Sequence, residues 1–306
     1  MATFFDEVKA IVLDRGTKAS KIHRLCNELK CTVYEANTFY NQVRGVQLMS
    51  QGGAALTSAT PRGARRFTIG VEIECFNIDR ESVKAAIERR GLQAHVSGYN
   101  HQDSKTSYKL GSDSSITGWG SCEVVSPILR NLDSLKTVCE VINEAGAQVN
   151  RSCGLHVHFG ASKFTVKQYQ RIIMNYAAIE PIIDSFMPNS RRNNTYCKGL
   201  SQVAERLRGG DCDTIQEIQL YGFDNDRYFK VNAMAYNTHK TIEFRQHNGT
   251  TNFEKIRNWV EFLSCFLQYS LSSEEPLTAT TIDELPFLTN RLKSFYKGRK
   301  EVFEVF

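Results

Sequence analysis

Acidic side chains alternate with apolar ones on a segment near residue 70. Residues 68–76 read TIGVEIECF, and the side chains of a strand point alternately to its two faces. Glu72 and Glu74 would then share one face, about 6 to 7 Å apart, where two carboxylates repel by roughly 2 to 3 kcal/mol. A bound divalent cation would reverse that cost. A half-exposed strand without a ligand fits the same pattern, because alternation is common in antiparallel sheets.

A second segment places two histidines in the same way. Residues 153–160 read CGLHVHFG, so a strand there directs His156 and His158 to one face and apolar side chains to the other. Imidazole nitrogens bind metal ions, and a protonated imidazole suits a phosphate. A single buried histidine is more often a hydrogen-bonded core residue, whereas two histidines between two glycines fit a metal or phosphate site about as well as they fit a core role.

A third segment adds a carboxylate and a guanidinium. Residues 241–247 read TIEFRQH, and the alternation predicts that Glu243, Arg245 and His247 share the polar face. Glu and Arg in alternation could also form a cross-strand ion pair. Glu123 adds a further carboxylate after a polar loop. Together the segments predict a group of carboxylates for divalent cations beside a guanidinium for a phosphoryl group.

These segments belong to a region of mixed strands and helices. Periodicity from residue 67 onward predicts an α+β domain whose mainly antiparallel sheet is covered by helices on one side. No Gly-x-x-x-x-Gly-Lys-Ser/Thr sequence occurs, so a P-loop does not hold phosphates. The strands are expected at residues 67–76, 93–96, 108–110, 122–126, 148–150, 155–159, 228–235 and 241–247. The helices are expected at residues 80–90, 132–144, 165–187, 201–207, 253–271 and 288–303.

The first 45 residues have a different character. Apolar residues at helical spacing predict three short helices within residues 3–45, which matches the outline of a helix-turn-helix. A small helical cap or an oligomerisation element fits the same spacing equally well. In the first interpretation, the residues that face a duplex would be Lys18, Lys21, Arg24, Asn37, Asn41 and Arg44.

A basic linker is expected between the two regions. Residues 47–66 lack periodicity and carry Gly, Ser, Thr and Pro, which predicts a flexible segment. The chain would then have a helical domain at residues 1–46 and a main domain at residues 67–306. Residues 1–66 hold ten Lys and Arg against five Asp and Glu, which is the whole surplus of +5. Any nucleic-acid partner is therefore expected at residues 1–66.

The composition excludes several classes of protein. Hydrophobic residues make up 41% of the 306 residues, and no apolar run approaches the roughly 18 to 20 residues of a membrane span. The first residues lack the pattern of a signal peptide, so we expect a cytoplasmic protein that does not bind membranes. Nine cysteines without a CxxC pair fit neither a disulfide framework nor a zinc ribbon, and reduced thiols are expected.

Four ordered motifs resemble those of a known family. GVEIE (70–74), SCEVVSPIL (121–129), CGLHVHFG (153–160) and TIEFRQHNGT (241–250) resemble the amidoligase family of phages, bacteria and fungi. That family is similar to the glutamine synthetase and glutamate–cysteine ligase superfamily of carboxylate–amine ligases. The resemblance implies a glutamine synthetase-like catalytic domain with a mainly antiparallel curved sheet at residues 67–306. A phage origin would place the protein in the host cytoplasm.

The resemblance also implies roles for single residues. His158 would lie near the nucleotide phosphates, and Arg245 would contact the transferred phosphoryl group. Glu243 and Arg245 are thus the expected catalytic residues. The implied metal ligands are Glu72, Glu74, Asp113, Glu123, His156 and Glu243.

The implied reaction is ATP-dependent formation of an amide from a carboxylate and an amine, whose identities the sequence leaves open. ATP would phosphorylate the acid to an acyl phosphate, with two or three Mg²⁺ or Mn²⁺ ions neutralising the developing charge. Arg191 and Arg192 are candidates for binding the nucleotide. Asn194, Arg227 and Asn232 are candidates for binding the substrate, although a solvated loop and a hairpin fit these residues equally well.

Three other functions remain open from the sequence. A metal-dependent hydrolase could use the same His-x-His and carboxylate cluster to activate water. A DNA-binding protein could carry a vestigial ligase-like domain behind its N-terminal helices. Cys153 or Cys197 could act as a nucleophile, but both are interpreted as structural.

Overall fold

The computed structural model describes residues 4–53, 58–97, 106–210 and 212–303. It divides the chain into two compact units. None of the described helices is long and apolar enough to span a membrane. The first unit comprises residues 1–56, 181–188 and 279–306, and the second comprises residues 57–180 and 189–278.

The first unit is helical in its described part. Its N-terminal helices enclose a small core, and helices from the far end of the chain belong to the same unit. The helices are α1 (Phe4–Leu13), α2 (Lys18–Leu29), α3 (Val33–Gly53), η4 (Ile282–Glu284) and α11 (Asn290–Phe303). The buried core residues are Val8, Ile11, Val12, Leu25, Ala36 and Val43.

Helix α3 extends beyond the predicted helical domain. Residues 47–53 belong to this helix, so the prediction of a linker that starts at residue 47 is wrong over its first part. Residues 54–57 of that linker lie outside the described residues, and its end forms the short helix η1 (Gly63–Arg66). Local sequence does not indicate this extension, because α3 packs along α11 and such packing contributes more to helix stability than propensity does.

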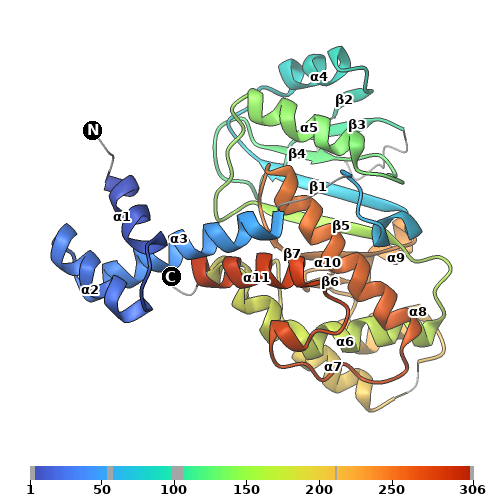
Figure 1. The fold of residues 1–306 in the computed structure, drawn as a ribbon. Coiled ribbons are helices and arrows are strands. Elements are labelled where there is room, and N and C mark those ends of the chain that lie inside the picture. The colour runs from blue at the N-terminus through green and yellow to red at the C-terminus, as the bar shows by residue number, and fades with distance from the viewer. Residues whose placement is uncertain (1–3, 54–57, 98–105, 211, 304–306) are drawn as a thin grey trace. The chain divides into compact units, whose positions relative to one another are not determined.

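A seven-stranded, mostly antiparallel sheet lies at the centre of the second unit (Figure 1). Among the described strands, β2 and β3 form the one parallel pair. The expected mixture of helices with a mainly antiparallel sheet is therefore confirmed. The strands in spatial order are β2 (Ala94–Ser97), β3 (Tyr108–Gly111), β4 (Cys122–Val125), β1 (Ile69–Cys75), β5 (Gly154–Gly160), β7 (Thr241–Asn248) and β6 (Val231–Asn232).

Helices pack on the apolar face of this sheet. In Figure 1, α5 (Asp133–Glu144) and α10 (Phe253–Ser272) cross in front of the strands. Phe244 of β7 contacts Tyr176 of α6 and Phe266 of α10, with ring centroids 5.4 and 6.2 Å apart. The other helices with residues in this unit are α4 (Arg80–Arg89), α6 (Val166–Ser185), η2 (Asn189–Arg191), α7 (Ser201–Arg208), α8 (Ile215–Glu217), the π-helical turn η3 (Ile218–Gly222) and α9 (Ala235–His239).

Two predicted strands are largely replaced by turns. Residues 148–150 contribute an isolated bridge at Gln148, because the Asn150 side chain bonds to the backbone of a neighbouring loop instead of continuing a strand. Of residues 228–235, only β6 pairs as a strand. The Asn232 side chain accepts a hydrogen bond from the Met234 N–H, which turns the chain toward α9.

Strand β7 contains a bulge at the centre of the polar face. The register of the β5–β7 pair shifts by one residue between Leu155 and Val157. The single residue between them, His156, lies opposite two residues of β7, Arg245 and Gln246. Such an unpaired extra residue reverses the alternation of side chains beyond it.

The bulge moves His247 to the apolar face. Its side chain is fully buried, and its ring centroid lies 5.4 Å from that of Trp259 on α10. The prediction that His247 shares the polar face with Glu243 and Arg245 is therefore wrong, because a strict period of two does not continue through a bulge.

Candidate functional site

The polar face of the sheet forms one wall of a cleft of about 510 Å³ within the second unit. Most residues singled out from the sequence line this cleft. Among the residues predicted to bind metal ions, the nucleotide or the substrate, Arg192 is not one of the lining residues. Those that line it are Glu72, Glu74, Asp113, Glu123, His156, His158, Arg191, Asn194, Arg227, Asn232, Glu243 and Arg245.

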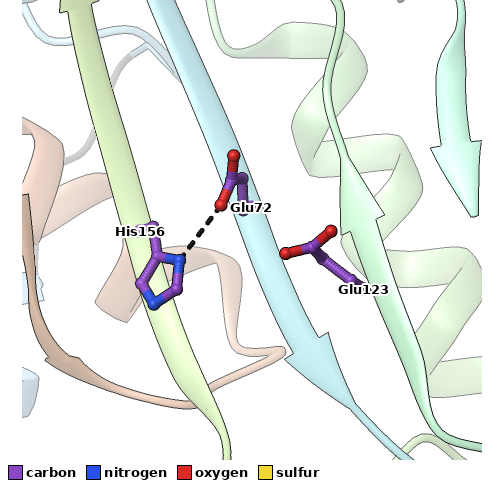
Figure 2. A group of neighbouring side chains, drawn as sticks. All are labelled: Glu72, Glu123 and His156. Atoms are coloured by element: carbon purple, nitrogen blue, oxygen red, sulfur yellow. Dashed lines mark hydrogen bonds and ion pairs between the residues drawn. The ribbon is translucent and has the colours of Figure 1, made fainter. Parts of the chain in front are cut away.

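His156 lies among carboxylates from two strands. Strands β1 and β5 pair with Glu72 directly opposite His156, and His156 Nδ1 lies 3.0 Å from Glu72 Oε2 (Figure 2). The same Nδ1 lies 3.6 Å from Glu243 Oε1, and Nε2 lies 3.5 Å from Glu74 Oε1. Both ring nitrogens therefore face carboxylate oxygens.

Glu72 is shared by the two histidines of the His-x-His segment. His158 Nε2 lies 3.2 Å from Glu72 Oε1. Burial alone would raise the pKa of Glu72, but the charge of His158 and the hydrogen bond from His156 hold that pKa well below its usual range. Glu72 is thus a carboxylate at neutral pH.

Glu74 and Glu123 lie opposite each other on β1 and β4. Glu74 is buried, and its Oε2 accepts a 2.5 Å hydrogen bond from the Gly154 backbone N–H. Burial, together with the charges of Glu72 and Glu74, raises the pKa of Glu123 to about 8. Glu123 is therefore mostly protonated at neutral pH, so the three neighbouring carboxyl groups carry fewer than three negative charges. A bound cation would favour the ionised form of Glu123.

Glu243 is held by two donors on the polar face. Its carboxylate accepts a 2.6 Å hydrogen bond from Asn232 Nδ2 and a 2.8 Å hydrogen bond from Arg245 Nη1. Burial alone would raise the pKa of Glu243, but the charges of Arg245 and His158 lower it. Glu243 is therefore an ionised and oriented ligand group.

His158 lies between two of these carboxylates. Its Nδ1 pairs with Thr241 Oγ1 at 3.0 Å, and its Nε2 lies 3.2 Å from Glu72 and 3.8 Å from Glu243 without a hydrogen bond of good geometry. Burial would lower the pKa of His158, but the charges of Glu243 and Glu72 raise it to about 9.

Three overlapping groups of side chains have the geometry to hold cations. In each group the ligand atoms lie within 4.8 Å of one another. Oxygen-rich donor sets with one imidazole or none suit Mg²⁺ and Mn²⁺, and none of the three groups contains a thiol. The residues therefore fit hard divalent cations. The groups are Glu72–Glu123–His156, drawn in Figure 2, Glu72–His158–Glu243 and Glu74–Asp113–Glu123.

Comparison with known proteins agrees with the sequence motifs. The family described as "Putative amidoligase enzyme" matches residues 65–267, which is more than half of the chain and includes every residue of the three groups. The chain belongs to the amidoligase family. Membership indicates an amide-forming ligase. A comparison with curated proteins gave no match.

In this amidoligase, the side chain of Arg245 lies beside the carboxylates. Its Nη1 donates to Glu243, its guanidinium lies 5.9 Å from the ring centroid of Tyr228, and its Nε is buried without a hydrogen bond. Burial would lower the pKa of Arg245, but the charges of Glu243 and Glu72 raise it. A permanent positive charge therefore lines the cleft next to the candidate metal ligands.

Arg191 and Asn194, like Asn232, use their side chains for contacts within the protein. Arg191 Nε donates to the Gln246 carbonyl at 3.4 Å, and its Nη2 donates to the Arg245 carbonyl. Asn194 Oδ1 accepts a 2.7 Å hydrogen bond from the Tyr196 N–H within its own loop. Both residues line the cleft, but these contacts engage part of their hydrogen-bonding capacity.

Lys109 and Tyr228 are among the residues of the cleft wall that sequence reasoning missed. Lys109 is buried on β3, and its charge opposes the rise in the pKa of Glu123. Alternation within residues 108–111 was the signal that could have placed Lys109 on the polar face. Tyr228 lies beneath the exposed Arg227, whose guanidinium is 5.1 Å from the ring centroid, and nothing in the local sequence indicates this contact.

The two cysteines that could have served as nucleophiles are buried. Cys153 and Cys197 are 1% and 0% exposed, and neither lines the cleft. Burial raises the pKa of Cys153, so its thiol stays protonated at neutral pH. Cys197 Sγ donates to the Arg191 carbonyl. These contacts agree with a structural role.

Proposed function

We propose that this amidoligase uses ATP to join a carboxylate to an amine through an acyl phosphate, on a catalytic domain with a glutamine synthetase-like fold. One observation supports this most. Carboxylates from β1, β4 and β7 converge with His156 and Arg245 in a single cleft, which is an arrangement suited to phosphoryl transfer.

The proposed reaction has two steps because a free carboxylate does not form an amide spontaneously in water. In the first step, an oxygen of the acid attacks the γ-phosphorus of ATP, and ADP leaves. In the second step, the amine nitrogen attacks the acyl carbon, phosphate leaves with the electrons of the C–O bond, and the nitrogen loses a proton.

The polar side chains of the cleft have separate tasks in this proposal. Two or three bound Mg²⁺ or Mn²⁺ ions would neutralise the charge that develops on the phosphates. Glu72, Glu74 and Glu123 would hold them, together with His156, Glu243 and Asp113. The Asp113 Oδ1 already accepts a 2.7 Å hydrogen bond from the backbone N–H of Ser115 in its loop.

Arg245 and His158 would contact the phosphates. A planar guanidinium can donate two parallel hydrogen bonds to a phosphoryl group, and the 2.8 Å hydrogen bond to Glu243 restricts the plane of Arg245. His158, as an imidazolium with its Nε2 beside Glu72 and Glu243, would donate to a phosphate oxygen.

Hydroxylamine allows a test in which the amine need not be known. The full chain is incubated with ATP, MnCl₂, hydroxylamine and single members of a set of carboxylic acids, and both hydroxamate and ADP are measured. We expect equal amounts of hydroxamate and ADP with at least one acid. Hydroxamate formed without ATP, or no ADP with any acid, would contradict the proposal. Hydrolysis of an added amide in the presence of MnCl₂ and the absence of ATP would instead identify a metal-dependent hydrolase.

A further inference from the structure

Arg191 is a buried arginine that reaches the bulge of β7. It ends the short helix η2 and is 5% exposed. Its Nε donates to the carbonyl of Gln246, and its Nη2 donates to the carbonyl of Arg245. These are the two residues of β7 that lie opposite the single residue His156. One guanidinium therefore bridges both carbonyls of the bulge.

Backbone carbonyls at a bulge need partners from outside the strand ladder. A buried carbonyl without a partner is costly, and the extra residue of a bulge disrupts the regular pairing. Arg191 supplies charged donors in a rigid fork, which fixes the backbone at Arg245 and Gln246 more strongly than a neutral donor would. Its own carbonyl accepts from Cys197 Sγ at 3.6 Å, which ties η2 to the following loop.

The direction of the Arg245 side chain depends on this backbone. Its Nη1 donates to Glu243 and its guanidinium lies 5.9 Å from the Tyr228 ring centroid, whereas its buried Nε has no hydrogen bond, so the backbone from which the side chain extends also helps to set its position. The space that Arg191 occupies exists because residue 154 is a glycine. A Cβ on Gly154 would lie 3.0 Å from Arg191 Nη2.

We infer that Arg191 is a positioning residue: it clamps the two carbonyls of the β7 bulge and thereby aims the Arg245 guanidinium into the cleft. This assignment differs from the sequence-based expectation that Arg191 binds the nucleotide. The expected effect of Arg191 on turnover rests on the proposed ligase function, whereas the expected effect of Arg191 on the conformation of Arg245 is independent of that function.

The conformational effect is tested on the full chain by the ¹⁵N–¹H resonance of Arg245 Nε, assigned by its loss in Arg245→Lys. Arg191→Met is the test variant. Arg299→Met is a matched control, because Arg299 is also buried and donates to a backbone carbonyl, that of Phe186, in the first unit. We expect Arg191→Met to shift or broaden the Arg245 resonance and Arg299→Met to leave it unchanged.

The catalytic effect is tested by hydroxamate formation and by binding of Mg²⁺ with a non-hydrolysable ATP analogue. In Arg191→Met, kcat should fall about 100-fold, while the Kd of the analogue changes by less than about threefold. Arg191→Lys, which keeps a charged donor, should recover part of kcat. The double variant Arg191→Met/Arg245→Lys should be no slower than Arg245→Lys, because both changes disable the same guanidinium.

Two results would overturn the inference. An unchanged Arg245 resonance in folded Arg191→Met would show that the bulge does not need the clamp. A tenfold weaker binding of the analogue with kcat unchanged would make Arg191 a nucleotide ligand. If the wild-type chain forms no hydroxamate with any acid, the proposed function fails, and the resonance of Arg245 still decides the role of Arg191.

Discussion

Glu123 is the carboxyl group of the cleft whose charge should depend most on a bound cation. Its pKa of about 8, raised by burial and by the charges of Glu72 and Glu74, keeps it mostly protonated at pH 7. A divalent cation favours the carboxylate, so Mn²⁺ binding should release up to about one proton at pH 7 and almost none above about pH 9.5. Below pH 8, the affinity for Mn²⁺ should fall by up to about tenfold for each pH unit.

Calorimetry in two buffers of different ionisation enthalpy measures this proton release. Glu123→Gln should remove the release, because the amide does not titrate in this range. A release of the same size in Glu123→Gln would assign the proton to another group.

Glu243 should be required for divalent-dependent turnover. Glu243→Gln preserves the size of the side chain but removes the charge that pairs with Arg245 and that a cation would need. We expect at least about a 100-fold loss of hydroxamate formation and weaker Mn²⁺ binding, with an unchanged circular dichroism spectrum. Full activity of Glu243→Gln would show that Glu243 is not part of the catalytic site.

A matched control for this change lies on α10. Glu261 and Arg257 form a pair of the same length, 2.8 Å, and neither lines the cleft. Glu261→Gln should cost some stability but leave turnover and Mn²⁺ binding as they are in the unchanged protein.

Arg245 should act on phosphoryl transfer more than on the fold. Arg245→Lys keeps the positive charge but loses the planar fork, so kcat should fall by about 100-fold or more with a much smaller change in nucleotide affinity. Assays of hydroxamate formation at saturating ATP measure kcat, and direct binding of an ATP analogue measures the nucleotide affinity. If Arg245→Lys has a lower melting temperature but normal turnover, Arg245 serves only as a structural ion-pair partner of Glu243.

At the scale of the strand, the start of β5 requires a glycine. The Gly154 N–H donates to Glu74, and a Cβ at this residue would lie 2.9 Å from His156 Nε2 and 3.0 Å from Arg191 Nη2. Gly154→Ala should therefore displace both side chains, lower stability by about 1 to 3 kcal/mol and weaken Mn²⁺ binding. Thermal melting and Mn²⁺ titration measure this, with Gly210→Ala as a control in open space. Equal effects of the two changes would contradict a special role for Gly154.

The faces of single strands could be predicted from the sequence, whereas the pairing between strands could not. Alternation placed Glu72 and Glu74 on one face of β1 and His156 and His158 on one face of β5, because side chains of a strand repeat with a period of two. The bulge of β7 depends on the register against β5, so alternation placed His247 on the wrong face.

The bridging role of Arg191 was hidden for a related reason. Its partners are backbone carbonyls more than 50 residues further along the chain, and a backbone carbonyl leaves no signal in the sequence. Residue types alone suggested a phosphate or carboxylate ligand for this guanidinium, because those are the anions that arginine binds most often.

At the scale of the whole chain, the sequence predicted units that are contiguous, and the structure groups distant segments. Helix α11 lies in the first unit and packs along α3, where a Cβ on Gly45 would lie 2.5 Å from the Gly298 carbonyl oxygen. Local periodicity predicts that both helices exist, but a contact between helices so far apart in the chain has no local signature.

Charged and polar groups of the first helices are already engaged within the first unit. Arg24 pairs with Asp14 at 2.7 Å and with Glu28 at 3.0 Å, and Lys18 Nζ donates to Asn41 Oδ1 at 3.2 Å. Arg24, Lys18 and Asn41 are among the residues that a helix-turn-helix would direct to a duplex. Contacts with phosphates or bases would have to replace these intramolecular contacts, which reduces the gain in free energy on binding.

We therefore expect the full chain to bind duplex DNA weakly and without sequence preference. Residues 1–66 carry a charge of +5, of which Arg62, Arg65 and Arg66 supply three, so the remaining +2 gives little attraction to phosphates. Fluorescence anisotropy with labelled duplexes at 50 and 200 mM salt measures the affinity. Replacing these three arginines by serine should remove most binding at low salt. Tight, sequence-selective binding that persists at 200 mM salt and in the triple variant would instead support recognition by the helices themselves.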